Sequence, residues 1–220
     1  MSNTGREATE TWNWLHHHIQ PLLDTIDLRV EIASHSLSRV DLFSKGGDLR
    51  PIIPVYNDTG GRLKNFCTDE WKRRVVQRWL REQGYGPKRP VVEWLGISVD
   101  EVERAKDSNK DWATHHYPLL FDVQMSRKEC IQLVQDTGLP TPPRSSCWMC
   151  PFRSDEEWVQ LKNRPDGDWK SAIALDEEIR TRGRFGKLYL HRTCVPLDEV
   201  QWKGQVHEPS DVCDTGRCEY

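Results

Sequence analysis

Two cysteines three positions apart, Cys147 and Cys150, are the clearest chemical feature of the sequence. They lie in RSSCWMCPFRSDEEW (144–158), between a proline-rich run and an acidic helix start. A Cys-x-x-Cys turn can place two thiolates within reach of one metal ion. The alternatives are buried thiols that bind nothing and a thiol redox pair. The redox pair is least favoured, because Pro151 follows directly and the next helix is expected only from Ser154.

Further sulfur ligands could come from cysteines far away along the chain. Cys67 lies at the entry of an expected helix, and a helix N-terminus lowers a thiol pKa, which favours the metal-binding thiolate. Cys218 lies in a tail with little else to fix it. Together with Cys147 and Cys150, these residues would satisfy either tetrahedral zinc or a four-iron, four-sulfur cluster. Spacing alone does not separate the two.

The chain has seven cysteines, an odd number and too few for a disulfide-rich secreted scaffold of this length. In a reducing compartment, clustered cysteines more often indicate metal or redox chemistry. Cys213 or Cys194 could replace Cys218 as the fourth ligand. Cys130 lies in an amphipathic segment and is expected to be a buried small hydrophobe.

Length and composition are those of a soluble globular protein. The 220 residues, 36% of them hydrophobic, can form one large domain or one domain with a small lobe. We expect a cytoplasmic protein without a membrane partner, because no apolar run could span a bilayer and no leader precedes the first helix. The net charge of −3 does not indicate nucleic-acid binding, although basic residues cluster locally.

The elements that must position these residues alternate between strands and helices. Periodicity and capping residues predict helices at 7–20, 68–83, 126–136, 154–163 and 167–182, and strands at 28–34 and 91–98. Such alternation indicates a parallel α/β sheet, in which ligands bind past the carboxyl ends of the strands. Here that edge follows the strand predicted at 91–98, which contains Gly96 and ends at Ser98. An acidic helix start comes directly after it, at Asp100.

Several longer motifs resemble one known family. The segments CTDEWKRRVVQRWLR (67–81), LGISVDEVERAKDS (95–108), the Cys-x-x-Cys segment and CDTGRC (213–218) are similar to those of phosphoadenosine phosphosulfate reductase-like proteins. These belong to the adenine-nucleotide alpha-hydrolase (PP-loop) superfamily, which also includes the DNA phosphorothioation sulfurtransferase. The resemblance implies an α/β fold with an incomplete parallel sheet of this type. It assigns residues 1–125 to a partial nucleotide-binding domain and 126–220 to a helical, cysteine-bearing lobe and tail.

The resemblance also implies roles for individual residues. The cysteines that match cluster-type positions of the family are Cys67, Cys147, Cys150 and Cys218. The resemblance therefore implies a 4Fe-4S cluster, with zinc as the alternative. Lys72 and Arg73 match basic residues that would bind a phosphate or sulfate. The loop that lines the nucleotide is matched by Gly96, Ser98, Glu101 and Arg104. Structural alternatives are a solvated helix face for the two basic residues, a turn at the glycine, and a surface ion pair for the last two.

One feature of the family is not found in this chain. Family members begin with a strand and a glycine-rich phosphate loop of the SGGxDS type, followed by a helix and a strand that ends in Asp-Thr-Gly. Here the segment from Ser2 to Gly5 resembles the end of that second strand, with Asn3 in place of the aspartate. Without the family's first strand, which is central in the sheet, its neighbouring strands would have exposed apolar faces and unpaired backbone groups at their edges. We therefore expect residues 1–220 alone to be marginally stable, or to pair with a protein partner or a second copy.

Two functions follow from these observations. The first is an oxidoreductase or sulfurtransferase that acts on an adenosine-nucleotide sulfur substrate with a cysteine-bound iron–sulfur cluster. The second is a non-catalytic, metal-stapled module that binds a nucleotide, a nucleic acid or a partner protein without the phosphate loop. Bound iron and sulfide, together with binding of the nucleotide, would distinguish them.

Overall fold

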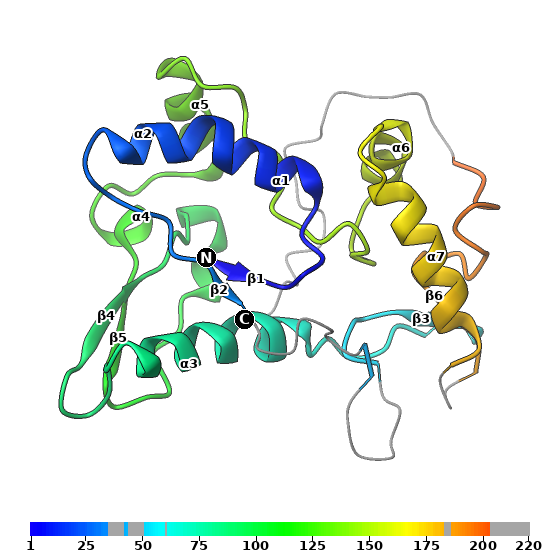
Figure 1. The fold of residues 1–220 in the computed structure, drawn as a ribbon, viewed down its shortest axis with the longest axis horizontal. Helices are drawn as coiled ribbons and strands as arrows, with labels where there is room; N and C mark the ends of the chain where they lie inside the picture. Colours follow the sequence, from blue (N-terminus) through cyan, green and yellow to red (C-terminus); the bar gives the residue numbers. More distant parts are fainter. Residues whose placement is uncertain (35–41, 44–50, 60, 183–185, 203–220) are drawn as a thin grey trace. The chain divides into compact units, whose positions relative to one another are not determined.

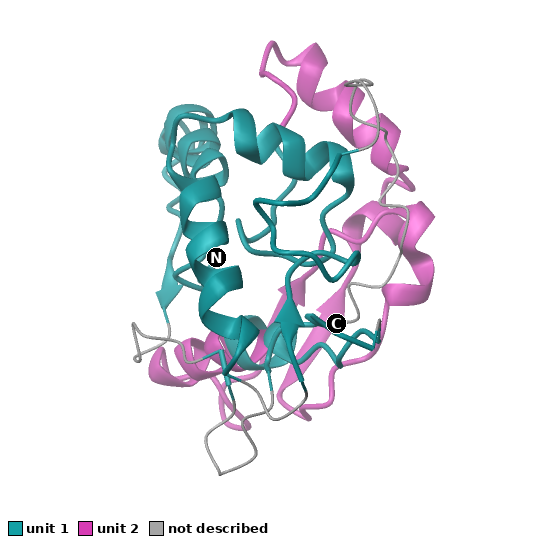
Figure 2. Ribbon diagram, turned by 90° about the vertical axis from the view of Figure 1, so that its right-hand side faces the viewer, with its two compact units in different colours: residues 1–72, 143–210 teal, residues 73–142, 211–220 magenta. Residues whose placement is uncertain are grey.

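The structure is a computed structural model that describes residues 1–34, 42–43, 51–59, 61–182 and 186–202. The chain divides into two compact units, residues 1–72 with 143–210 and residues 73–142 with 211–220 (Figure 2). Both units contain helices and short strands, and two of the three small sheets formed by the described residues are parallel. This confirms the predicted α/β class. The division predicted at residue 125 stays a prediction.

The first unit begins with a short parallel strand pair and a long helix. Strand β1 (Ser2–Asn3) pairs in parallel with β2 (Ala33–Ser34). The connecting helix runs through α1 (Thr9–Trp14), a π-helical segment (Leu15–Ile19) and α2 (Gln20–Asp24) (Figure 1). It confirms the predicted helix at 7–20 and extends beyond it. Of the strand predicted at 28–34, only the last two residues pair.

The second half of this unit is formed by two helices that lie side by side, α6 (Asp155–Asn163) and α7 (Asp168–Arg180) (Figure 1). Helix α6 begins with a capping box, in which the Ser154 hydroxyl accepts from the Glu157 amide and the Glu157 carboxylate accepts from the Ser154 amide. Strands β3 (Tyr56–Asn57) and β6 (Leu188–Tyr189) pair antiparallel. Both helices were predicted within a few residues of their bounds.

The most deeply buried of the carboxylates described in the first unit belongs to Asp176. Asp176 of α7 is fully buried and accepts hydrogen bonds from the backbone amides of Leu190 (2.7 Å) and Leu197 (3.1 Å). It also forms an ion pair with Arg180, one turn further along the helix (2.7 Å). This side chain therefore fastens the segment around β6 to α7. The surrounding apolar core consists of Leu42, Phe43, Ile53, Val55, Trp71, Met149, Trp158, Leu161, Ala172, Leu175, Ile179, Leu188, Leu190 and Leu197.

A second buried polar group, His191, should make the stability of this unit depend on pH. Its Nε2 lies 3.0 Å from Asp155, its Nδ1 lies 2.8 Å from the Thr193 hydroxyl, and the residue is 2% exposed. Burial lowers the pKa of the imidazole below 6.5, although Asp155 opposes this shift. The unfolded chain therefore binds the proton more readily. The stabilisation is present above the unfolded pKa and is lost as the pH falls through that value towards the folded one.

We expect the free energy of unfolding of the wild type to fall between about pH 7.5 and pH 5.5 by more than that of His191→Gln. Urea denaturation at the two pH values measures this difference. The matched control is His17→Gln, because His17 is exposed and contacts only the Asn13 carbonyl in the described chain. Equal pH dependence of wild type and His191→Gln would contradict the assignment.

The second unit contains the remaining elements. A π-helical turn (Thr68–Arg73), of which only Arg73 belongs to the second unit, leads into α3 (Arg74–Glu82). Strand β4 (Val91–Trp94) pairs in parallel with β5 (Ala113–His116). A 3-10 segment (Val99–Arg104) and the helices α4 (Pro118–Phe121) and α5 (Arg127–Asp136) follow. The predicted helices at 68–83 and 126–136 and the strand at the start of 91–98 are therefore confirmed.

The end of α3 shows why the helix stops where the sequence predicts. Gly84 has a φ of +84°, and its amide donates to the Arg81 carbonyl at 2.9 Å. The next amide, of Tyr85, donates to the Leu80 carbonyl at 3.0 Å. This is a Schellman motif, and its left-handed position favours glycine.

One face of the β4–β5 pair is open. Val92 and Trp94 alternate along β4 and are 57% and 71% exposed. Parallel sheets normally have both faces covered.

None of the helices in the described ranges is long and apolar enough to cross a membrane.

Candidate metal centre

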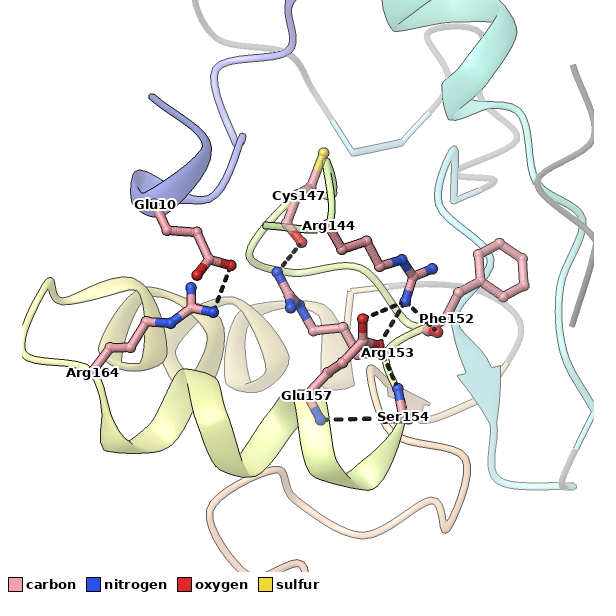
Figure 3. Close-up of polar contacts among 8 residues, drawn as sticks. All are labelled: Glu10, Arg144, Cys147, Phe152, Arg153, Ser154, Glu157 and Arg164. Atoms are coloured by element: carbon pink, nitrogen blue, oxygen red, sulfur yellow. Dashed lines mark hydrogen bonds and ion pairs between the residues drawn. The ribbon is translucent and has the colours of Figure 1, made fainter. Parts of the chain in front are cut away.

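The Cys147–Cys150 segment forms two successive turns. The Cys150 amide donates to the Cys147 carbonyl at 3.1 Å, and the Arg153 amide donates to the Cys150 carbonyl at 3.1 Å. The guanidinium of Arg153 donates a further bond to the Cys147 carbonyl at 3.1 Å (Figure 3). The segment is therefore a hydrogen-bonded loop, as predicted for a Cys-x-x-Cys turn.

The N-terminal segment pairs with this loop. The Trp148 amide donates to the Arg6 carbonyl at 3.0 Å, and the Ala8 amide donates to the Ser146 carbonyl at 3.1 Å. These bonds flank Glu7 and Cys147, which form an antiparallel bridge. In such a non-hydrogen-bonded pair the two side chains lie on one face and close together. The register therefore places the Glu7 carboxylate beside the Cys147 thiol.

Three side chains meet at this position. The Thr4 hydroxyl lies 3.4 Å from the Cys147 sulfur and donates to Glu7 Oε1 at 3.1 Å. The Cys147 sulfur lies 3.9 Å from the same oxygen. Thr4 and Glu7 are both at least nine-tenths buried. Glu7 Oε2 is also buried and has no hydrogen-bond partner among the residues that the structure describes.

This environment keeps Cys147 protonated. Burial and the nearby Glu7 carboxylate raise the pKa of the thiol to about 12, against the opposing effects of Thr4 and Lys72. At neutral pH the residue is therefore a thiol and not a nucleophilic thiolate. A metal ion that binds here must displace the proton, so binding would release protons to solvent.

Arginine side chains surround the loop on the α6 side (Figure 3). Arg144 contacts both carboxylate oxygens of Glu157, at 2.8 and 2.6 Å. Arg164 forms an ion pair with Glu10 at 2.5 Å. Arg153 is 4% exposed, and burial lowers the pKa of its guanidinium. Arg144 and Arg164 are thus paired with glutamates, whereas Arg153 is buried and donates to the Cys147 carbonyl of the loop itself.

Cys67 lies at the beginning of the helix that leads into α3. Its sulfur donates to the Asn65 side-chain oxygen at 3.0 Å, and its amide contacts the same oxygen at 3.2 Å. The following turn, Thr68–Arg73, is π-helical, so hydrogen bonds join residues five apart. Cys67 and Cys147 pack against the same apolar core, and the charge of Lys72 acts on Cys147.

The structure brings together only part of the predicted ligand set. No three histidine, cysteine, aspartate or glutamate side chains in the described ranges are arranged to hold one metal ion. Cys218 and Cys213 lie outside the described residues. Cys194 has a φ of +54° and donates to the Asn57 carbonyl at 3.0 Å, and Cys130 is half-buried on α5. The four-cysteine set therefore stays a prediction.

The predicted nucleotide-binding residues lie at the carboxyl end of β4. Ser98 is 4% exposed, and its hydroxyl has no hydrogen-bond partner in the described part of the chain. Gly96 lies close to Leu119: a Cβ at this glycine would be 3.8 Å from Leu119 Cδ1. Glu101 and Arg104 form an i,i+3 ion pair, as their structural alternative predicted. Arg73 is half-buried and begins the second unit.

Sequence reasoning missed Thr4, Glu7 and Arg153 as parts of this site. No spacing pattern reveals that the segment TGRE (4–7) contains a residue that pairs with a cysteine more than 130 positions later. Arg153 follows the cysteine pair directly, yet charged residues are usually exposed, so its burial has no sequence signal.

No protein-family model, no curated protein and no solved structure matches the chain.

Proposed function

We propose that the chain is a phosphoadenosine phosphosulfate reductase-like or sulfurtransferase-type protein that acts on an adenosine-nucleotide sulfur substrate with a cysteine-bound iron–sulfur cluster. The observation that carries this proposal is the Cys147 environment. The Cys147 thiol, in a hydrogen-bonded Cys-x-x-Cys loop, lies beside the buried Glu7 carboxylate, and Oε2 of that carboxylate has no hydrogen-bond partner among the described residues. A buried anion of this kind is unfavourable unless a cation or a proton accompanies it, and a metal ion would supply that charge.

Thiolates are the donor type that suits a soft metal centre, although no three of the described side chains are arranged around one ion. Cys147 and Cys150 would hold the group together with Cys67 and, in the predicted set, Cys218. When bound, an iron–sulfur cluster supplies electron transfer or Lewis acidity. Cys147 would give up its proton on binding. Lys72 carries positive charge beside this thiol and could hold a sulfonate or phosphate group.

The position of residues 95–98, directly after the carboxyl end of β4, supports the nucleotide part of the proposal. In parallel α/β sheets, ligands bind beyond the carboxyl ends of the strands. The buried Ser98 hydroxyl is available there as a donor or acceptor. Gly96, Glu101 and Arg104 line the same segment of the chain and are proposed to contact the nucleotide.

Metal analysis tests the first half of the proposal. Anaerobically purified protein should be brown and contain iron and acid-labile sulfide in about equal amounts. The metal-loaded protein should then release heat when phosphoadenosine phosphosulfate is titrated into it. A colourless protein without iron or sulfide would overturn the cluster, and a metal-loaded protein that gives no heat would overturn the enzyme.

The second candidate is a non-catalytic, metal-stapled binding module, with zinc as the alternative metal. The burial of Cys147 favours it, because a buried thiol with a pKa of about 12 holds structure more readily than it attacks a substrate. Zinc without sulfide in the purified protein, together with no heat on addition of the nucleotide, would support this module.

A further inference from the structure

Three side chains of the first unit form a hydrogen-bonded series that the proposed function does not use. The Thr193 hydroxyl lies 2.8 Å from Nδ1 of His191, and Nε2 of the same imidazole lies 3.0 Å from Oδ1 of Asp155. Asp155 begins α6, 36 positions away from the histidine, so the arrangement depends on the tertiary fold. A hydroxyl, an imidazole and a carboxylate in this order are the groups by which a hydroxyl nucleophile is activated.

The backbone determines which nitrogen of the His191 imidazole carries the proton. The Thr193 amide donates to Nδ1 at 3.4 Å, so Nδ1 is an acceptor and the proton lies on Nε2, which faces the Asp155 carboxylate. Burial lowers the pKa of His191, so the imidazole is neutral at pH 7. In this form Nδ1 can take the proton of the Thr193 hydroxyl.

The threonine is accessible although the imidazole is not. The Cys194 amide donates to the His191 carbonyl at 3.1 Å, which closes a β-turn with Arg192 and Thr193 at its centre. Thr193 is exposed, whereas His191 is 2% exposed and its ring packs against that of Trp202. A substrate can therefore reach the hydroxyl while the base is shielded from water.

We propose that Thr193 is the nucleophile of an acyl-transfer site for carboxylic esters, with His191 as its general base and Asp155 as the residue that positions the imidazole. The Thr193 oxygen forms a bond to the ester carbonyl carbon, and the bond from that carbon to the leaving alkoxide breaks. The hydroxyl proton passes to His191 Nδ1 and then to the alkoxide, which leaves as an alcohol. Water releases the acyl group as a carboxylic acid by the same proton transfer. These steps use only the three side chains and water, so the inference does not rest on the proposed function.

Reaction of the full chain with p-nitrophenyl acetate tests the nucleophile. The wild type should release a burst of p-nitrophenol, and fragmentation of its peptides by mass spectrometry should place an acetyl group on Thr193. Thr193→Ala should lose both, whereas Thr193→Ser keeps a hydroxyl and should retain both. The matched control is Thr137→Ala, because Thr137 is also exposed but its hydroxyl donates to the Val134 carbonyl. It should behave as the wild type does.

Two further variants test the other members of the series. His191→Gln should lower the rate of the burst at least about a hundredfold. Asp155→Asn should lower kcat and leave KM unchanged, because this carboxylate orients the base and does not contact the ester. A raised KM at unchanged kcat in Asp155→Asn would contradict the positioning role.

The variants of Thr193 decide the case in which His191→Gln fails to fold, because the threonine is exposed. No burst in the wild type, or an equal burst in the wild type and Thr193→Ala, would overturn the inference. An acetyl group on the neighbouring Cys194 in place of Thr193 would also overturn it.

Discussion

Replacing Asp176 by leucine is expected to lower the free energy of unfolding by about 3–5 kcal/mol, because it breaks a buried ion pair and leaves two buried amides without acceptors. These amides belong to Leu190 and Leu197, and the carboxylate also holds Arg180. Leucine is similar in size, so the effect would come from lost polar contacts more than from lost volume. Urea denaturation followed by circular dichroism measures the change.

The control for this prediction lies on the same helix. Glu178 is exposed and pairs only with Arg182 in the described chain, so Glu178→Leu should change the stability by no more than about 0.5 kcal/mol. If Asp176→Leu were as stable as this control, Asp176 would not fasten the β6 segment to α7. Its burial would then have another cause.

Loss of bound metal from Cys147→Ser is the second large effect that we expect. Serine is nearly isosteric with cysteine, but its hydroxyl is a poor ligand for iron and zinc. Because Cys147 is the cysteine that contacts both the N-terminal segment and the loop, its replacement should reduce metal per chain at least about tenfold. Iron, zinc and sulfide analysis of anaerobically purified protein gives the result.

Cys130→Ser provides the comparison. Cys130 is half-buried on α5, where burial raises the pKa of its thiol, and it belongs to no predicted ligand set. It should therefore retain the metal of the wild type. Full metal content in Cys147→Ser would remove this residue from the centre and with it the main support for the proposed function.

The helices could be predicted from the sequence because their signals are local. Ser126 and Ser154 each have a glutamate three residues later, and both form the capping boxes that this spacing predicts. Gly84 ends α3 by a left-handed turn. The strand at 28–34 was largely wrong, because alternation of apolar residues does not guarantee a pairing partner, and only Ala33 and Ser34 find one.

The candidate site was predictable only where its residues are neighbours in the chain. The spacing of Cys147 and Cys150 predicts a turn, and the hydrogen bond between the Cys150 amide and the Cys147 carbonyl confirms it. The contact of Cys147 with Glu7 joins residues 140 positions apart. It depends on the antiparallel register of two short segments, which neither composition nor periodicity specifies.

The π-helical turn at Thr68–Arg73 has a consequence for how this chain tolerates length changes. A π turn accommodates one residue more than an α turn, since its hydrogen bonds span five positions instead of four. Deleting a single residue there would allow a regular α-helix, in which Cys67 and Lys72 would be four positions apart and would therefore lie on one face of the helix. A shortened chain could thus keep both its helix and the neighbourhood of a sulfur and an ammonium group.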